Sequence, residues 1–209
     1  MFRKFGERWI AQGEAFQRRS YDSYDDYLEH QRAKLETHEF GQYDDDFRQA
    51  LRERLTSLEL EWQGRNVLCL GARIGSEVKA FLDLGAFAVG IDLNPGKENR
   101  YVVQGDFHDL QYAPNSIDVV FTNSLDHVFD IERIAKEVLK VLKPDGIFLV
   151  EAVQGRDQGI NPGFFESFFW QNIDQLVRVF GNAGFTVSRR TPITHPWPGE
   201  QICFRRPFA

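Results

Sequence analysis

The chain has 209 residues, of which 42% are hydrophobic and 27% are charged, and its formal net charge is −6 at pH 7. This length is enough for one domain of about 150 residues plus an appended segment. The acidic balance argues against an extended nucleic-acid backbone as a partner. No stretch is apolar over the length that crosses a bilayer, and residues 1–8 lack the apolar core of a signal peptide. These features predict a cytoplasmic protein with no membrane partner.

The first part of the chain is rich in Arg, Asp, Glu and Tyr, and no strand-like run precedes Asn66. Apolar and aromatic residues recur there at helical spacing and predict two helices. The first helix rests on Tyr24, Tyr27, Leu28, Gln31 and Leu35, and the second on Phe47, Ala50, Leu51, Leu55 and Leu58. We therefore expect residues 1–63 to form a helical N-terminal extension. Its first helix either covers a ligand site or packs by its aromatic face against the main domain.

Residues 64–209 alternate between strand-like and helical patterns and are expected to form the main domain. The predicted strands are 67–70, 86–91, 101–104, 117–122, 147–150, 185–189 and 201–205. Ser76 and Asp130 are the expected N-caps of two of the intervening helices. This order predicts an α/β, Rossmann-like, doubly wound sheet of seven strands. The sheet should be mostly parallel with an antiparallel last strand, because no helix separates the final two strands.

The two cysteines, Cys69 and Cys203, both lie inside apolar strand-like runs. Such positions are typical of buried thiols in a reducing compartment rather than of a disulfide. The sequence shows no metal-ligand spacing, so no metal is expected.

The turn after the first strand of the main domain contains Gly71 and Gly75, which allow backbone N–H groups to face a ligand. On its own this pattern also fits an ordinary strand-to-helix turn. The second strand ends at Asp92, and an acid there can accept hydrogen bonds from the two hydroxyls of a ribose. Together the turn and the acid favour a nucleoside ligand.

Asp106 and Phe107 follow the third strand, where the carboxylate can accept from an adenine amino group and the ring can pack on the base. Taken alone, Asp106 is equally typical of a solvent-facing loop. These residues, together with the segment 142–146 (Leu-Lys-Pro-Asp-Gly), resemble the class I S-adenosylmethionine-dependent methyltransferases, specifically the type 11-like group. The resemblance covers about residues 65–153. It implies that S-adenosylmethionine is the cofactor and that it contacts Gly71, Ala72, Arg73, Gly75, Asp92, Leu93, Asn94, Asp106, Phe107, Asn123 and Ser124.

The glycine turn departs from the pattern of that group at two places. Cys69 and Leu70 precede Gly71 where an acid is usual, and Arg73 stands at the position of a central glycine. Arg73 either pairs with the methionine carboxylate of the cofactor or points to solvent. These departures keep a non-catalytic binding or assembly module open as an alternative.

The fourth strand ends in a polar segment, residues 122–127, which should border the transferred methyl group because ligands bind at the carboxyl ends of parallel strands. His127 is the candidate base, since an imidazole titrates near neutrality, and Asp126 either orients it or contacts the acceptor. Alternatively, both residues only satisfy the loop backbone. Further on, the aromatic segment 163–170 and the loop 192–199 either line an acceptor pocket or serve as core and surface connection.

The predicted function is methyl transfer from S-adenosylmethionine to an O or N nucleophile of a small or medium-sized acceptor. A nicotinamide-dependent oxidoreductase would share the glycine turn and the ribose acid, but it does not account for the reversed last strand. Methylation of a protein or an RNA is a further alternative. The sequence does not define the oligomeric state.

Overall fold

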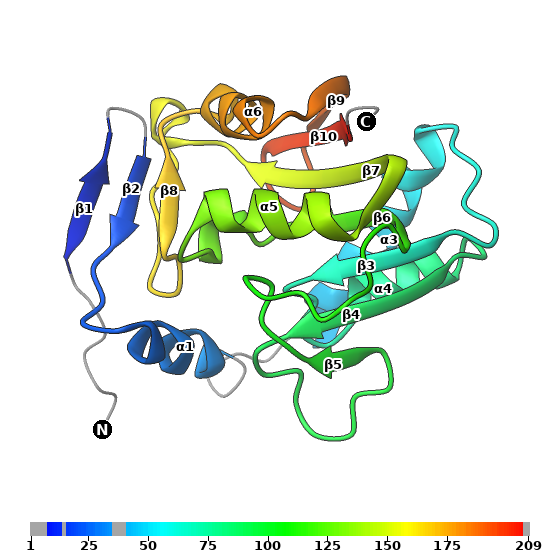
Figure 1. The fold of residues 1–209 in the computed structure, drawn as a ribbon, viewed down its shortest axis with the longest axis horizontal. Helices are drawn as coiled ribbons and strands as arrows, with labels where there is room; N and C mark the ends of the chain where they lie inside the picture. The colour runs from blue at the N-terminus through cyan, green and yellow to red at the C-terminus, as the bar shows by residue number, and fades with distance from the viewer. Residues whose placement is uncertain (1–7, 14–15, 35–40, 207–209) are drawn as a thin grey trace.

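The computed structural model describes residues 8–13, 16–34 and 41–206 (Figure 1). Its centre is a seven-stranded sheet with the strand order β5-β4-β3-β6-β7-β10-β9. The strands are β3 (Asn66–Leu70), β4 (Phe87–Asp92), β5 (Val102–Gln104), β6 (Ile117–Thr122), β7 (Leu142–Val153), β9 (Thr186–Ile193) and β10 (Gly199–Arg205). Strands β3 to β7 pair in parallel, whereas β10 pairs antiparallel with both β7 and β9. The predicted doubly wound sheet with a reversed last strand is therefore confirmed.

Helices cover both faces of this sheet and divide the core into two layers. Helices α3 (Gly41–Ser57) and α4 (Ser76–Leu82) lie on one face, and α5 (Ile131–Val141) and α6 (Ile173–Asn182) lie on the other (Figure 1). The side chains of β3 alternate accordingly. Val67 and Cys69 belong to the layer of α3 and α4, and Leu68 and Leu70 to the layer of α5 and α6. Burial on both faces explains why β3 reads as a continuous apolar run.

The two predicted helix caps have different outcomes. Asp130 is the N-cap of α5, and its carboxylate accepts from the backbone N–H groups of Glu132 and Arg133, as expected. The prediction for Ser76 is wrong, because Gly75 precedes the helix as N-cap and Ser76 is its first residue. Gly75 has a φ of +92°, and a Cβ built on it would lie 2.8 Å from Cβ of Tyr101. A left-handed turn in such tight surroundings selects glycine over a side-chain cap.

The N-terminal extension is not purely helical, so this part of the prediction is wrong. Strands β1 (Trp9–Gln12) and β2 (Phe16–Arg19) form a hairpin, and β2 pairs antiparallel with β8 (Phe168–Trp170). This small sheet stands beside the main one, and α1 (Tyr24–Arg32) follows it (Figure 1). Leu35, part of the expected first helix, lies outside the described residues. The expected second helix is present as α3, and a boundary at residues 63/64 stays a prediction.

Helix α3 shares the core of the main sheet, because Phe47, Leu51 and Leu55 are buried in the same cluster as β3 and α4. Cys69 and Cys203 are both free and buried. Among the described helices, none has the length and apolar character needed to cross a bilayer.

Candidate functional site

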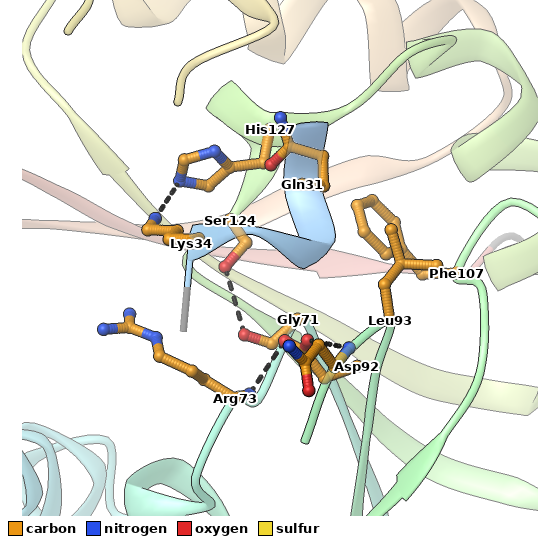
Figure 2. Close-up of a pocket in the computed structure, with 10 residues that line it drawn as sticks. Gln31, Lys34, Gly71, Arg73, Asp92, Leu93, Phe107, Ser124 and His127 are labelled. Carbon is orange, nitrogen blue, oxygen red and sulfur yellow. Dashed lines mark hydrogen bonds between the residues drawn. The ribbon is translucent and has the colours of Figure 1, made fainter. Parts of the chain in front are cut away.

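Two adjoining cavities lie at the carboxyl ends of β3, β4 and β6, where an open parallel sheet places its ligands. They share the side chains of Lys34, Arg73, Ser124 and His127. The smaller cavity, of about 40 Å³, is drawn in Figure 2. It is lined by Gln31, Lys34, Gly71, Arg73, Asp92, Leu93, Asn94, Phe107, Ser124 and His127.

The glycine turn and the acid after β4 are joined by hydrogen bonds. Asp92 accepts from the backbone N–H of Arg73 and from that of Asn94, each at 2.9 Å. Burial raises the pKa of Asp92, and these two hydrogen bonds oppose the rise. Gly71 has a φ of +67°, and a Cβ there would lie 2.8 Å from both Cβ and Oγ of Ser124. The turn therefore approaches the segment after β6 too closely for a side chain at position 71.

Arg73 occupies a backbone conformation that suits glycine better. Its φ is +46°, in the left-handed region that costs a residue with a Cβ about 1–2 kcal/mol. Its guanidinium extends to the same side of the smaller cavity as Lys34, whereas Leu93 and Phe107 lie on the opposite side (Figure 2). One end of the cavity is thus cationic and the other apolar.

Phe107 and Leu93 are buried side chains that form the apolar end of the smaller cavity. Asp106, the neighbour of Phe107, does not line it. One oxygen of Asp106 accepts from Tyr24 at 2.5 Å, and the other accepts from the backbone N–H of His108 at 2.8 Å. Burial opposes ionisation of Asp106, but the hydrogen bonds from His108 and Tyr24 outweigh it and lower its pKa. In this arrangement the carboxylate holds helix α1 against the loop after β5.

Helix α1 borders the smaller cavity and also packs by its aromatic face. The two alternatives predicted for this helix are therefore compatible. Gln31 and Lys34 line the cavity, while Tyr24 and Tyr27 pack against Phe129. The Nζ atom of Lys34 lies 2.7 Å from Nε2 of His127. Burial, and then the charge of Arg73, lowers the pKa of Lys34.

His127 belongs to a 3-10 turn, η1 (Leu125–His127), that follows β6. Because Lys34 donates to Nε2, the ring proton lies on Nδ1, which is 3.0 Å from the carbonyl oxygen of Phe165. Burial, followed by the charge of Lys34, lowers the pKa of His127 to about 3. The imidazole is therefore neutral at physiological pH, with both nitrogens engaged.

The larger cavity has a volume of about 290 Å³. Acidic and aromatic side chains dominate its wall. Besides the four shared residues, it is lined by Asn123, Asp126, Glu151, Val153, Ile160, Asn161, Glu166, Phe169, Trp170 and Trp197. Burial raises the pKa of Asp126 to about 6, although the charge of Lys34 opposes the rise. Phe169 and Trp170 come from the expected aromatic segment, which serves as core and as cavity wall together.

Glu151 is a fully buried carboxylate at the base of the larger cavity. Arg54 donates to its two oxygens from Nε and Nη2 at 2.7 and 2.8 Å, and Gln201 donates to the first oxygen at 2.8 Å. The remaining Nη1 of Arg54 donates to the carbonyl of His195, in the loop that carries Trp197. This pair therefore fixes α3 and the 192–199 loop to β7.

The N-terminal extension also holds the backbone of the site. Tyr27 donates to the carbonyl of His127, and Gln31 donates to that of Phe165. The N–H of Ser167 donates to the carbonyl of Asp126 at 2.7 Å. Hydrogen bonds between segments far apart in the sequence thus hold the backbone beside the two carboxylates of the larger cavity, Asp126 and Glu166.

The structure brings most of the sequence-predicted residues together. Gly71, Arg73, Asp92, Leu93, Asn94, Phe107, Ser124 and His127 line the smaller cavity, and Asn123 and Asp126 line the larger one. Ala72, Gly75 and Asp106 line neither cavity. Ala72 packs against Gly90, and Gly75 caps α4. The sequence indicated no individual role for Lys34, Glu151 or Glu166, although Glu166 lies in the aromatic segment 163–170 that was expected to line an acceptor pocket or to serve as core.

Asp126, His127 and Glu166 offer ligand atoms that all lie within 4.8 Å of one another, a spacing that a metal ion can bridge. This grouping joins η1 to the segment before β8, so sequence spacing could not reveal it. Both ring nitrogens of His127 are already engaged by Lys34 and by Phe165. The imidazole therefore has no lone pair to offer in this arrangement.

Glu77 is a buried acid in the first turn of α4, and its carboxylate accepts from Asn123 at 3.3 Å. Burial raises its pKa from 4.5 to about 7. The folded chain then binds more protons than the unfolded chain between these values, so this group lowers stability as pH rises through them. Glu77→Gln should raise the unfolding free energy at pH 8 by on the order of 3 kcal/mol and much less at pH 5.

Urea unfolding of the wild-type chain and Glu77→Gln at both pH values tests this expectation. An equal difference at pH 5 and pH 8 would show that the carboxyl group titrates normally in the folded chain.

Comparison with known proteins agrees with this geometry. Residues 68–150 match the Methyltransf_11 family model, described as a methyltransferase domain. A probable S-adenosylmethionine-dependent methyltransferase of Mycolicibacterium smegmatis is 26% identical over 147 residues, which are 63% of this chain and 56% of that protein. Residues 68–150 are therefore similar to a methyltransferase domain, and S-adenosylmethionine-dependent methyltransferases are among the relatives of this chain. A sterol 24-C-methyltransferase of Aspergillus fumigatus is 32% identical over 104 residues, which are 41% of this chain and 27% of the relative.

The chain spans about half the length of the first of these relatives and about a quarter of the second. Solved structures of S-adenosylmethionine-dependent methyltransferases share the fold of this chain. The 1,6-didemethyltoxoflavin-N1-methyltransferase of Burkholderia thailandensis, solved with 1,6-didemethyltoxoflavin and S-adenosylhomocysteine, has a TM-score of 0.70 at 15% identity. The match covers 94% of this chain and 97% of that one. At such identity the likeness establishes the shared fold.

Proposed function

We propose that this chain transfers a methyl group from S-adenosylmethionine to an O or N nucleophile of a small or medium-sized acceptor. The observation that carries the proposal is the pair of adjoining cavities, which share one wall at the carboxyl ends of β3 and β6. The smaller cavity takes the cofactor, and the larger one takes the acceptor. When bound, the cofactor supplies a methyl group on a sulfonium, which is a good leaving group.

The residues that line the smaller cavity are of the types that can hold the ribose and the base of this cofactor. Asp92 keeps unused lone pairs on both oxygens after its two backbone contacts, so it can also accept from ribose hydroxyls. Phe107 and Leu93 supply an apolar surface for the base. Gly71 leaves its backbone open. Because the cavity that Gln31 and Lys34 help to line is only about 40 Å³, we expect α1 to shift when the cofactor enters.

Arg73 is assigned to the carboxylate of the cofactor, which explains why a strained position carries an arginine. Arg73→Gly should relieve the left-handed backbone and leave the unfolding free energy unchanged or raised by up to about 1 kcal/mol. The same change should weaken binding of S-adenosylhomocysteine roughly 10-fold or more, because a charge-assisted hydrogen bond is lost. Thermal unfolding and titration calorimetry measure the two effects separately. Unchanged affinity would remove Arg73 from the cofactor site.

On the acceptor side of the wall that the two cavities share, Asp126 and His127 have different roles. The sequence favoured His127 as the base, but its Nε2 accepts from Lys34 and its low pKa makes it a weak base. We therefore propose that the carboxylate of Asp126 accepts the proton that the acceptor loses. His127 is then a positioning residue that holds Lys34. Asp126→Asn should lower methyl transfer by about 10²-fold or more at unchanged cofactor affinity. An equal loss of rate and cofactor affinity would make Asp126 a binding residue instead.

Calorimetric titration with S-adenosylhomocysteine and with NADH tests the proposal as a whole. The glycine turn and Asp92 alone would also suit a nicotinamide cofactor. We expect binding of S-adenosylhomocysteine only. Binding of NADH alone would overturn the assignment in favour of an oxidoreductase.

We further propose that the partner is a small molecule and that the protein works in the cytoplasm. The acceptor cavity of about 290 Å³ suits a small molecule. The net charge of −6 disfavours an RNA substrate, and the two free cysteines suit a reducing compartment.

A further inference from the structure

We infer that the acceptor presents a primary amine, bound between the carboxylates of Asp126 and Glu166, on an aromatic or otherwise apolar body. The inference rests on the proposed function and names its substrate class. The relevant surface is the acceptor cavity, whose wall combines these two acids with Phe169, Trp170 and Trp197.

Two buried oxygens in this wall lack hydrogen-bond donors. Within the described residues, neither Oδ1 of Asp126 nor Oε2 of Glu166 has a donor in reach. The near neighbour of Oδ1 is Nε2 of His127, at 3.6 Å, and that nitrogen carries no proton. A buried acceptor without a donor is costly, so such atoms point to a ligand that donates.

The spacing of the two acids favours an amine over a hydroxyl. Carboxylate oxygens of Asp126 and Glu166 lie within 4.8 Å of each other. One nitrogen can donate to both across that distance, since each N–H···O contact spans about 2.9 Å. A hydroxyl carries one hydrogen and can satisfy only one of the two acids.

The three acids that line the acceptor cavity differ in their hydrogen-bond partners. Glu151 is neutralised by Arg54, which donates to both of its oxygens. Asp126 and Glu166 are the other acids of the described wall, and they share the cavity with the cations Lys34 and Arg73. Trp170 and Trp197 line the same cavity, and aromatic rings favour a cationic or N–H-bearing ligand over a neutral alcohol.

A divalent metal ion is the other occupant that these acids could attract. The structure favours the amine, because His127 donates to Phe165 through Nδ1 and accepts from Lys34 through Nε2. A metal would have to displace the ammonium group of Lys34 to reach a nitrogen ligand. A metal site is therefore an outcome that the experiment must be able to detect.

In this placement the nitrogen of the acceptor attacks the methyl group directly. The lone pair of the neutral amine forms a bond to the methyl carbon, and the carbon–sulfur bond breaks with its electrons passing to sulfur. The products are a thioether, S-adenosylhomocysteine, and a methylated ammonium. That ammonium then gives a proton to the carboxylate of Asp126, which passes it to solvent.

The test uses ligand pairs that share one body and differ in the reacting group: tryptamine against tryptophol, and benzylamine against benzyl alcohol. Each is titrated into the protein saturated with S-adenosylhomocysteine, and Mn²⁺ is titrated separately. We expect the amines to bind and the alcohols to bind at least 10-fold more weakly. Asp126→Asn and Glu166→Gln should each weaken amine binding roughly 10- to 100-fold and leave the affinity for S-adenosylhomocysteine unchanged. The exposed acid Glu132 provides the matched control, Glu132→Gln, with no expected effect.

The outcomes separate this inference from the proposed function. If S-adenosylhomocysteine binds while the alcohols bind as well as the amines, or neither class binds, the amine assignment is overturned alone. Mn²⁺ binding that Asp126→Asn abolishes would replace it by a metal site. Failure of S-adenosylhomocysteine to bind would overturn the proposed function and the inference with it. Retained cofactor affinity in the variants shows that they are folded.

Discussion

Replacing Asp92 by alanine should weaken binding of S-adenosylhomocysteine by about 10- to 150-fold, equivalent to roughly 1.5–3 kcal/mol. The carboxylate does two things at once in this structure. It accepts from the backbone N–H groups of Arg73 and Asn94, which fixes the two loops that face the cavity, and it offers its remaining lone pairs to a ribose. The alanine variant loses both contributions. Isothermal titration of each variant measures the effect.

Asp92→Asn separates the two contributions of this carboxylate. Its amide oxygen can still accept one backbone N–H, but its NH₂ group faces the other N–H donor and disturbs that loop. We expect most of the affinity loss to persist in Asp92→Asn. Asp109→Asn, an exposed acid in the loop after β5, is the matched control and should bind normally. Wild-type affinity in Asp92→Ala would contradict the assignment of this site to the nucleoside.

Replacing Arg54 by alanine should destabilise the fold by about 3–5 kcal/mol, because it leaves the fully buried carboxylate of Glu151 with Gln201 as its one side-chain donor among the described residues. This is a large part of a typical domain stability of about 5–15 kcal/mol. Urea unfolding followed by tryptophan fluorescence gives the free energy. The acceptor cavity should also lose order, since Arg54 fixes the loop that carries Trp197.

Two comparisons show whether burial is the cause of that loss. Arg48, also in α3, donates to both oxygens of Asp83, but the side chains of this pair are 37% and 27% exposed. Arg48→Ala should therefore cost no more than about 1 kcal/mol. Adding Glu151→Gln to Arg54→Ala removes the unpaired charge and should restore part of the stability. Equal losses in Arg48→Ala and Arg54→Ala would contradict this account.

The main sheet could be predicted from the sequence because each of its central strands is buried on both faces. Val67 to Leu70 and Ile147 to Val150 are uninterrupted apolar runs, and such runs between helical patterns leave few other arrangements. Asp92 was also predictable, since its place at the end of β4 follows from the order of the strands. The antiparallel last strand follows from the absence of a helix between β9 and β10.

The N-terminal hairpin could not be predicted in the same way. Phe16–Arg19 has only one apolar residue, and it forms a strand because β8, about 150 residues away, offers it a partner. Long-range pairing of this kind leaves no local periodicity in the sequence. The role of Asp106 was equally hidden, because Tyr24 from α1 reaches its carboxylate across 82 residues.

Asp126 was predicted on the acceptor side of the site, but its neighbours Lys34 and Glu166 were missed for a related reason. Lys34, Asp126 and Glu166 come from an N-terminal segment, a turn after β6 and the segment before β8, and only the tertiary fold brings them together. No spacing rule applies to such a set. His127 was found by its chemical type, but its partner Lys34, which occupies Nε2, was not.

A crystal structure of the protein with S-adenosylhomocysteine tests the central claim most directly. The account predicts the ribose hydroxyls on Asp92, the base between Leu93 and Phe107, and the sulfur at the wall shared by Ser124 and His127, facing the larger cavity. A nucleoside bound elsewhere, or a sulfur turned away from the cavity that contains Asp126 and Glu166, would contradict it.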